Sequence, residues 1–196
     1  MWFSERRRRG GIAIFHEITK PFDVFFDIAK GRVDLLGKRT VRRYNDVKQI
    51  FCEIDAKLEK ENPIIYEVFE APIPEKEGEL MFLITVLYPG KVNGEFFMTK
   101  GHYHVVENTA EVYLGLSGKG LVLCQTKEGD FESLEISPNK VVYIPPCWAH
   151  RTVNTSSEPL VFFGIYPAHA GHDYESIEKS GFRKRVFVDQ NRVCIR

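Results

Sequence analysis

From Ile64 onward, the pattern of apolar and polar positions is that of short β-strands. Alternation of apolar and polar residues is typical of a strand with one face in a core. The pattern predicts strands over residues 64–69, 80–88, 95–99, 102–106, 111–116, 121–126, 131–136, 141–144 and 160–166. Turn sequences such as Pro89-Gly90 separate several of them. Many short strands at this spacing indicate a sandwich or barrel, and a jelly roll fits best.

Residues 46–61 show a helical pattern instead. Their apolar residues recur at helical spacing, namely Val47, Ile50, Phe51, Ile54 and Leu58. Asp46 and Gln49 can form a capping box at the start, and Asn62-Pro63 ends the helix. Near the other end we expect a short helix over 173–179 and a hairpin of strands 185–188 and 192–195. The predicted fold class is therefore mainly all-β, a jelly-roll β-barrel with an N-terminal helix-containing extension.

Length and composition predict one domain and exclude some partners. The 196 residues suit a single domain over 19–196, with an Arg-rich extension over 1–18. Lys plus Arg and Asp plus Glu both number 27, so there is no broad basic field and nucleic acid is not expected as a partner. No apolar run approaches the roughly 18 residues that span a bilayer, so no membrane partner is expected. The apolar stretch after Arg6-Arg7-Arg8-Arg9 is too short for a signal peptide and lacks a cleavage site, so we expect a cytoplasmic protein.

The cysteines give no sign of a disulfide framework or a thiolate zinc site. They are scattered, and no pair has CxxC spacing: Cys52, Cys124, Cys147 and Cys194. We expect buried, reduced thiols.

Three histidines and one glutamate form a candidate metal site. His102 and His104 are two residues apart, so on a strand both point to the same face. Glu111 and His150 are expected to come from neighbouring strands of the same sheet. Neutral imidazoles and a carboxylate bind divalent first-row ions such as iron, manganese, nickel or zinc, and four protein ligands leave positions open for substrate.

The spacing around these four residues resembles that of the cupins. Residues 89–118 resemble the first cupin motif and residues 141–154 the second, in which Asn154 follows His150 at HxxxN spacing. Asn139 and Cys147 stand where the second motif usually has glycine. Asparagine tolerates the left-handed conformation that such a glycine supplies. The gap between His104 and Glu111 is longer than in most cupins.

The longer gap and several further motifs resemble one branch, the cupin-type glucose-6-phosphate isomerases found mainly in archaea. The likeness spans about residues 20 to 188. The motifs that agree in order and spacing are Tyr66-Glu67-Val68, Thr85-Val86-Leu87-Tyr88-Pro89-Gly90, Thr99-Lys100-Gly101-His102-Tyr103-His104, Ala110-Glu111-Val112-Tyr113, Val142-Tyr143-Ile144-Pro145-Pro146, Trp148-Ala149-His150-Arg151-Thr152-Val153-Asn154, Ile165-Tyr166-Pro167-Ala168 and Ala170-Gly171-His172-Asp173-Tyr174.

The resemblance implies a metal-dependent isomerase that interconverts glucose 6-phosphate and fructose 6-phosphate in glycolysis and gluconeogenesis. It implies one divalent ion per subunit, expected to be Fe²⁺ with Mn²⁺, Ni²⁺ or Zn²⁺ as alternatives, held by His102, His104, Glu111 and His150. Such an ion can coordinate the carbonyl and neighbouring hydroxyl oxygens of the sugar and acidify the C–H between them. Glu111 can be ligand, proton-transferring base or both. An enediolate route and a hydride shift both stay open.

The resemblance also implies the residues that contact the sugar phosphate. Tyr166 and His172 are expected to act with Glu111 in proton transfer or ring opening. The substrate-binding residues are expected to be Tyr66, Thr85, Thr99, Gly101, Tyr113 and Tyr174. Each tyrosine can equally be ordinary barrel filling with a satisfied hydroxyl. Lys100 can add charge to the pocket or point outward.

Two other functions are compatible with the same ligands. One is another metallo-cupin enzyme, such as a dioxygenase or decarboxylase, which oxygen uptake would support. The other is a non-catalytic sugar-binding cupin, which tight sugar-phosphate binding without turnover would support. The apolar strand at Val161-Phe162-Phe163 suggests a buried outer face, so a homodimer is expected.

Overall fold

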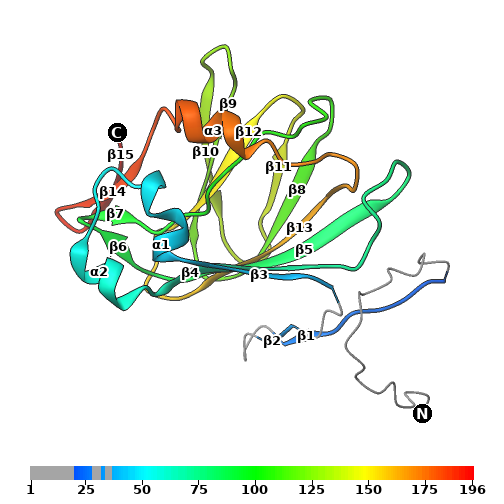
Figure 1. Cartoon of the computed structure of the whole chain (residues 1–196), viewed down its shortest axis with the longest axis horizontal. Helices are drawn as coiled ribbons and strands as arrows, with labels where there is room; N and C mark the ends of the chain where they lie inside the picture. The colour runs from blue at the N-terminus through cyan, green and yellow to red at the C-terminus, as the bar shows by residue number, and fades with distance from the viewer. Residues whose placement is uncertain (1–19, 28–31, 34–36) are drawn as a thin grey trace.

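The computed structural model describes residues 20–27, 32–33 and 37–196 (Figure 1). The predicted extension over residues 1–18 lies outside the described residues, so the division of the chain at residue 18 stays a prediction. Among the helices of the described ranges, none is long and apolar enough to cross a membrane.

One large antiparallel sheet forms most of the barrel wall. Its strands, in spatial order, are β11 (Val141–Ile144), β8 (Glu111–Ser117), β13 (Leu160–Pro167), β5 (Leu80–Leu87), β4 (Ile64–Glu70) and β3 (Arg39–Arg43). Neighbours far apart in sequence, such as β8 and β13, show the crossing connections of a jelly roll rather than a simple meander.

Two smaller sheets complete the wall. One orders β10 (Phe131–Ile136), β9 (Gly120–Gln125) and β12 (Ala149–Asn154), and the other orders β15 (Arg192–Ile195), β14 (Val186–Asp189), β7 (Glu95–Phe96) and β6 (Lys91–Val92). A two-residue pair, β1 (Phe26–Asp27) with β2 (Arg32–Val33), lies apart from them. The inward side chains of the larger sheets share one core cluster, which includes Tyr113, Val122, Ile136, Val153 and Phe162. The predicted mainly all-β jelly roll is confirmed.

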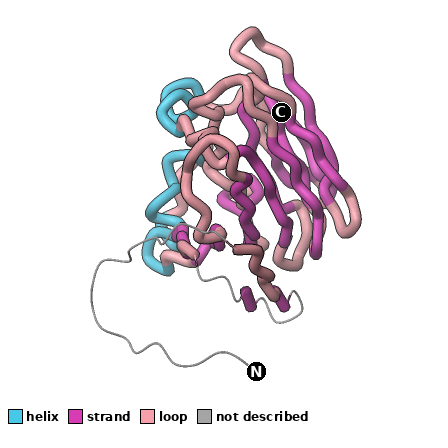
Figure 2. The backbone as a smooth tube through the Cα atoms, turned by 90° about the vertical axis from the view of Figure 1, so that its right-hand side faces the viewer, coloured by secondary structure: helices cyan, strands magenta, loops and turns pink. Residues whose placement is uncertain are grey.

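The helices gather on one side of the strands (Figure 2). They are α1 (Tyr44–Val47), the 3-10 turn η1 (Lys48–Ile50), α2 (Ala56–Glu61) and α3 (Tyr174–Ser180). The predicted single helix over 46–61 is wrong, because the chain leaves the helical conformation at Phe51, whose side chain packs into the core. Asp55 then caps a new helix by accepting from the amides of Lys57 and Leu58. The Asp46 carboxylate accepts from the Arg43 amide at 2.8 Å, and the predicted box of Asp46 with Gln49 is not formed.

Most strands lie within two residues of the predicted ranges, but three differences affect the site. The predicted strand over 102–106 is wrong, since only isolated bridges occur there, from His102 to His150 and from Tyr103 to Asp173. Gly101 has a φ of 78°, which interrupts a regular strand just before them. The predicted strand over 95–99 is only β7, followed by a bridge from Met98 to Val153. The third difference is that the predicted ranges omit β3 and also β12, the strand that carries His150.

The cysteine prediction is half right. The four thiols are free, but only Cys124 is buried, whereas Cys52 and Cys147 are exposed. Asn139 adopts a φ of 67°, as expected for an asparagine in a glycine position, and Cys147 adopts a φ of 69° at the other such position. The turn geometry of the motif is therefore kept although the glycines are replaced.

Asn154 ties the two walls of the barrel together. Its side-chain amide is completely buried and donates to Leu87 O at 2.9 Å and to Glu158 O at 2.8 Å. Its carbonyl oxygen accepts from the Ser156 amide and hydroxyl, both at 2.9 Å. Since Leu87 ends β5 and Asn154 ends β12, one side chain connects the large sheet with the sheet opposite.

We predict that Asn154→Ala lowers the free energy of unfolding by about 3 kcal/mol, because the buried Leu87 carbonyl and the half-buried Glu158 carbonyl lose their donor. Equilibrium unfolding in guanidinium chloride measures the change. Ser156→Ala, which removes only the exposed hydroxyl partner, is the control and is expected to cost less than about 1 kcal/mol. Equal effects of the two variants would contradict the connecting role of Asn154.

Candidate active site

Four side chains converge inside the barrel as a possible metal centre. Potential ligand atoms of His102, His104, Glu111 and His150 all lie within 4.8 Å of one another. His104, Glu111 and His150 are buried residues with at most 7% exposure, and His102 Nε2 is a buried atom. This confirms the sequence prediction that these four residues meet.

The four residues come from both walls of the barrel, not from one sheet. Glu111 opens β8 in the large sheet, whereas His150 lies in β12 of the three-stranded sheet. The expectation that they occupy neighbouring strands is therefore wrong. His102 is held beside His150 by two backbone hydrogen bonds, His102 N to His150 O at 3.3 Å and His150 N to His102 O at 3.1 Å. The site closes across the barrel interior because strands of opposite sheets face each other there.

Thr109 fixes the proton on His104. The Thr109 hydroxyl donates to Val106 O at 2.6 Å, so it accepts from His104 Nδ1 at 2.8 Å. His104 Nδ1 therefore carries a proton, and Nε2 lies 3.1 Å from Glu111 Oε2. A ring nitrogen and a carboxylate oxygen at this distance are held together by a proton or a metal ion between them.

The charges of the four side chains, and the ring nitrogens among them that lack a hydrogen-bond partner, fit a divalent cation. Burial would raise the pKa of Glu111, but His150 and His104 bring it down to about 2, so the carboxylate is ionised. Burial and the neighbouring histidines lower the pKa of His102 well below its usual value, so this ring is neutral. His102 Nε2 and His150 Nδ1 are buried without a hydrogen-bond partner in the described ranges, and His150 Nε2 lies 2.9 Å from Glu111 Oε2. Buried polar atoms rarely stay unpaired, and a metal ion would pair them.

A cavity of about 220 Å³ opens beside this centre. Its lining includes the predicted residues Tyr66, Thr85, Thr99, Gly101, Tyr113, His172 and Tyr174, together with His102, Glu111 and His150. Most of the predicted site residues therefore line one cavity, and their contacts with a substrate stay a prediction. Tyr166 does not line the cavity, and its ring instead packs 5.4 Å from His172 and 6.0 Å from His104.

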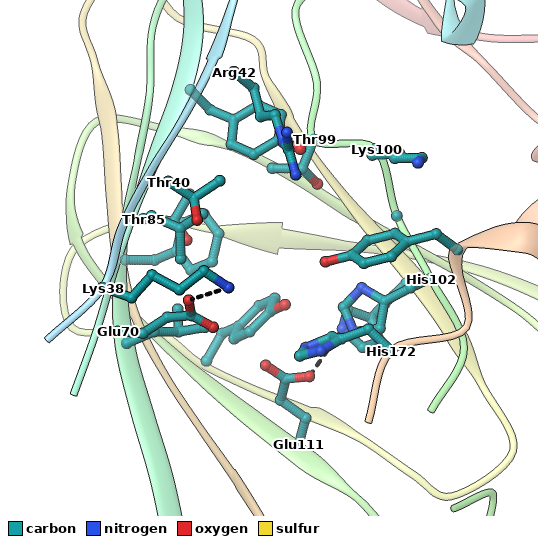
Figure 3. Close-up of a pocket in the computed structure, with 18 of the residues that line it drawn as sticks. Lys38, Thr40, Arg42, Glu70, Thr85, Thr99, Lys100, His102, Glu111 and His172 are labelled. Carbon is teal, nitrogen blue, oxygen red and sulfur yellow. Dashed lines mark ion pairs between the residues drawn. The ribbon is translucent and has the colours of Figure 1, made fainter. Parts of the chain in front are cut away.

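The cavity has two chemically different ends (Figure 3). Glu111, His102 and His172 lie at one end, and Arg42, Thr99 and Lys100 at the other. Lys100 Nζ pairs with Glu178 Oε1 at 2.5 Å and lies 4.8 Å from the centre of the Tyr174 ring. The question of whether Lys100 faces the pocket is therefore settled, since it lines the cavity wall and is half-buried by α3.

Strand β3 adds residues that the sequence prediction missed. Lys38, Thr40 and Arg42 line the cavity, and Lys38 pairs with Glu70 at 3.6 Å. Thr40 and Arg42 are two residues apart, so they share the inner face of β3. Their only sequence signal was the alternation in Arg39-Thr40-Val41-Arg42, which shows a strand but not its partner. The pairing of Arg42 with Tyr66 in β4 is what carries them to the cavity.

The tyrosines and His172 are uncharged at neutral pH. Burial and the nearby Glu111 raise the pKa of Tyr113, whose hydroxyl bonds to this carboxylate, and also raise the pKa of Tyr166. Burial raises the pKa of Tyr66, although Arg42 and the Lys100 amide oppose it. Burial lowers the pKa of His172 to about 4, and its ring lies 4.4 Å from that of His102. His172 is thus a pocket residue and not merely a loop histidine bonded to its neighbour. At the end where Glu111 lies, the cavity therefore offers neutral donors beside an ionised carboxylate.

Comparison with known proteins gives one consistent family. The family model described as "Glucose-6-phosphate isomerase (GPI)" matches residues 41–196. Glucose-6-phosphate isomerase of Thermococcus gammatolerans is 50% identical over 91% of this chain and 95% of its own length, and that of Pyrococcus furiosus is 49% identical over 90% and 94%. A putative glucose-6-phosphate isomerase of Rhizobium meliloti is 36% identical over 90% of this chain and 84% of its own length.

Among solved structures, oxalate decarboxylase from Bacillus subtilis is similar over 52% of this chain and 26% of that one, with a TM-score of 0.42 and 23% identity.

We predict that Thr109→Val weakens metal binding about tenfold, because His104 Nδ1 loses the nearer of its two acceptors, the hydroxyl at 2.8 Å, and keeps only Thr109 O at 3.2 Å. Titration of metal-depleted protein with Mn²⁺ or Zn²⁺, followed by calorimetry, measures the affinity. Thr126→Val is a matched control, since Thr126 is equally buried but bonds only to the turn at Gly129 and Asp130. Unchanged affinity in Thr109→Val would show that this hydrogen bond does not order the site.

Proposed function

The chain belongs to the glucose-6-phosphate isomerase family, and from that premise we propose that its cavity binds the sugar with the carbonyl end at Glu111 and the phosphate at Thr99. The chain is an isomerase that interconverts glucose 6-phosphate and fructose 6-phosphate. The observation that carries the proposed binding mode is the polarity of one cavity, with a metal-ligand set at one end and cations with hydroxyls at the other. This polarity matches a substrate that has a carbonyl with a neighbouring hydroxyl at one end and a dianion at the other.

The phosphate end uses neutral donors backed by positive charge. Thr99 Oγ1 accepts from the Thr152 amide at 3.0 Å, so its own proton is free to donate into the cavity. The hydroxyl of Tyr66 lies beside the Lys100 amide and Arg42. Hydrogen bonds from such groups to an ionised phosphate are stronger than those to a neutral acceptor. We assign Thr85 and Tyr174 to the wall along which the sugar chain extends, since both line the cavity.

The metal end is made of three imidazoles and one carboxylate. We propose that His102, His104, Glu111 and His150 hold one ion, expected to be Fe²⁺, with Mn²⁺, Ni²⁺ and Zn²⁺ able to use the same ligands. When bound, a divalent ion polarises the carbonyl of the open-chain sugar and the hydroxyl next to it.

The proton is moved by groups of the chain itself. Glu111 is ionised and lines the cavity, so it can take a proton from one carbon and return it to the next. Tyr113 bonds to this carboxylate and can orient it. His172 is neutral and faces the same end, so it can relay a proton between sugar oxygens during ring opening. Tyr166 packs against His172 and is better placed to hold this ring than to touch the sugar.

The outer face of the large sheet suggests a second copy of the chain as partner. Tyr143 pairs with Val112, and Val141 pairs with Leu114, on β11 and β8. Tyr143 and Val141 are 58% and 62% exposed. These pairs form two apolar rows across the strands. Ile165 of β13 extends the row of Tyr143 and Val112, and Phe163 of β13 extends the row of Val141 and Leu114. We propose that this face forms the interface of a homodimer, because a twofold axis can bury one such patch against itself. We also propose that the protein acts in the cytoplasm, in glycolysis and gluconeogenesis.

We predict that the metal-loaded protein converts fructose 6-phosphate to glucose 6-phosphate, that chelation removes at least nine-tenths of this activity, and that adding back single metals restores it. A coupled assay with glucose-6-phosphate dehydrogenase measures the product. Glu111→Gln is expected to lower kcat by about 100-fold or more, since general-base catalysis contributes about that factor. The metal content of this variant must be measured in parallel, because Glu111 is also a ligand.

The assay has a clear failing outcome. If wild-type protein holding one metal ion per chain leaves fructose 6-phosphate unconverted, the proposed function is wrong. Undiminished activity after complete metal removal would refute the metal-dependent mechanism alone.

We predict that Tyr143→Glu separates the homodimer, because it places a charge in one of the apolar rows. Light scattering coupled to size-exclusion chromatography measures the mass. Leu134→Glu is the control, since Leu134 is an exposed apolar residue on β10, in the opposite sheet. A wild-type protein that is monomeric at micromolar concentration would contradict the proposal, as would a variant that keeps the dimer mass.

A further inference from the structure

A buried arginine lies behind the phosphate end of the cavity. Arg151 is 2% exposed, and its Nε and Nη2 atoms donate to Lys100 O at 3.2 Å and 2.6 Å. The centre of its guanidinium lies 4.4 Å from the centre of the Phe182 ring, which packs on it. Arg151 is thus fixed by one carbonyl and one aromatic face.

No carboxylate of the described ranges forms an ion pair with Arg151. Glu95 acts on it from a distance, but the Glu95 carboxylate bonds to Arg185 at 2.9 Å and to the Cys52 amide at 2.7 Å. Buried charges in proteins are usually paired, because an unpaired charge in a medium of low dielectric constant is costly. The charge of Arg151 therefore calls for an anion that is not a side chain of this part of the chain.

The peptide between Lys100 and Gly101 connects Arg151 to the cavity. The chain has no cis peptide bond in its described ranges, so the Lys100 carbonyl and the Gly101 amide of this peptide point in opposite directions. Since Arg151 binds the carbonyl from the core, the amide faces the other way, where Gly101 lines the cavity. The Gly101 amide has no hydrogen-bond partner among the described residues.

Local sterics keep this peptide in place. Gly101 has a φ of 78°, and a Cβ there would lie 2.7 Å from the Phe182 ring and 3.0 Å from His150 O. Residues with side chains rarely adopt this conformation. Glycine, the aromatic ring and Arg151 together hold one amide aimed at the cavity.

We propose that Arg151 is a positioning residue for the substrate phosphate, which it binds through the Lys100–Gly101 peptide. It orients the Gly101 amide toward a phosphate oxygen and places a buried positive charge behind that amide. The exposed Arg42 and the paired Lys100 are screened by solvent or by Glu178, whereas a buried charge is screened much less. The inference rests on the proposed function, since it takes the anion to be the phosphate of the sugar.

Three substitutions separate the two contributions of Arg151. Arg151→Met removes donor and charge, Arg151→Gln keeps a donor, and Arg151→Lys keeps a charge with one donor. We expect Arg151→Met to raise KM for fructose 6-phosphate and the inhibition constant of inorganic phosphate about tenfold or more, with kcat changed less than threefold. Arg151→Lys should bring both constants back to within about threefold of wild type, and Arg151→Gln should lie between.

Arg183→Met is the matched control. The exposed Arg183 guanidinium also donates to a backbone carbonyl, Lys127 O at 3.3 Å, but outside the cavity. Loss of one positive charge alone should leave KM and the inhibition constant unchanged there. Calorimetric titration of each metal-loaded variant with inorganic phosphate gives the same comparison without turnover.

Each outcome decides the proposal. Wild-type constants in Arg151→Met, or equal effects of Arg151→Met and Arg183→Met, overturn it. A loss of kcat with unchanged KM overturns it as well, because that result indicates a structural effect on the metal end. If Arg151→Met fails to fold, Arg151→Gln and Arg151→Lys decide, and equal constants in these two variants and wild type overturn the proposal. A wild-type protein without isomerase activity refutes the proposed function instead, and the phosphate titrations still test Arg151.

Discussion

The pairing of residues 98–103 with β12 is the constraint on which the rest of the site depends. Met98 bridges to Val153, the Thr99 amide donates to Thr152 O at 2.9 Å, and His102 exchanges two backbone bonds with His150. This pairing brings the first histidine pair beside the third histidine. It also aligns the Lys100–Gly101 peptide over Arg151. One short stretch of backbone pairing therefore sets the distance between the metal end and the phosphate end.

The site is built from polar groups that the protein itself leaves incompletely paired. Among the described residues, His102 Nε2 and His150 Nδ1 lack partners at one end, and the Gly101 amide and the Arg151 charge lack them at the other. Such groups destabilise the free protein, and a ligand that satisfies them binds more tightly for that reason. The jelly roll, stabilised by contacts such as those of Asn154, tolerates the free-energy cost of these unpaired groups because its strands hold the groups in place.

Much of the site was predictable from the sequence because its residues belong to local motifs. His102 and His104 are related by strand geometry, and the Thr99, Tyr113 and His172 positions agree with motifs that keep their order and spacing. Asn139 was rightly expected in a left-handed turn. Helix 46–61 was predicted wrongly because Phe51 is buried more favourably by leaving the helix, which periodicity cannot reveal. Lys38, Thr40 and Arg42 were missed because only the pairing of β3 with β4 brings them to the cavity.

The sequence by itself therefore determined the fold class, the four candidate ligands and the family, since these follow from local periodicity, residue chemistry and motif order. The tertiary structure alone decided that Glu111 and His150 face each other from opposite sheets rather than lying side by side. It also decided that β3 brings Thr40 and Arg42 to the cavity and that the buried Arg151 lies behind the Lys100–Gly101 peptide. These features depend on which strands pair across long stretches of chain, and that choice is made by burial of the whole core rather than by any local pattern.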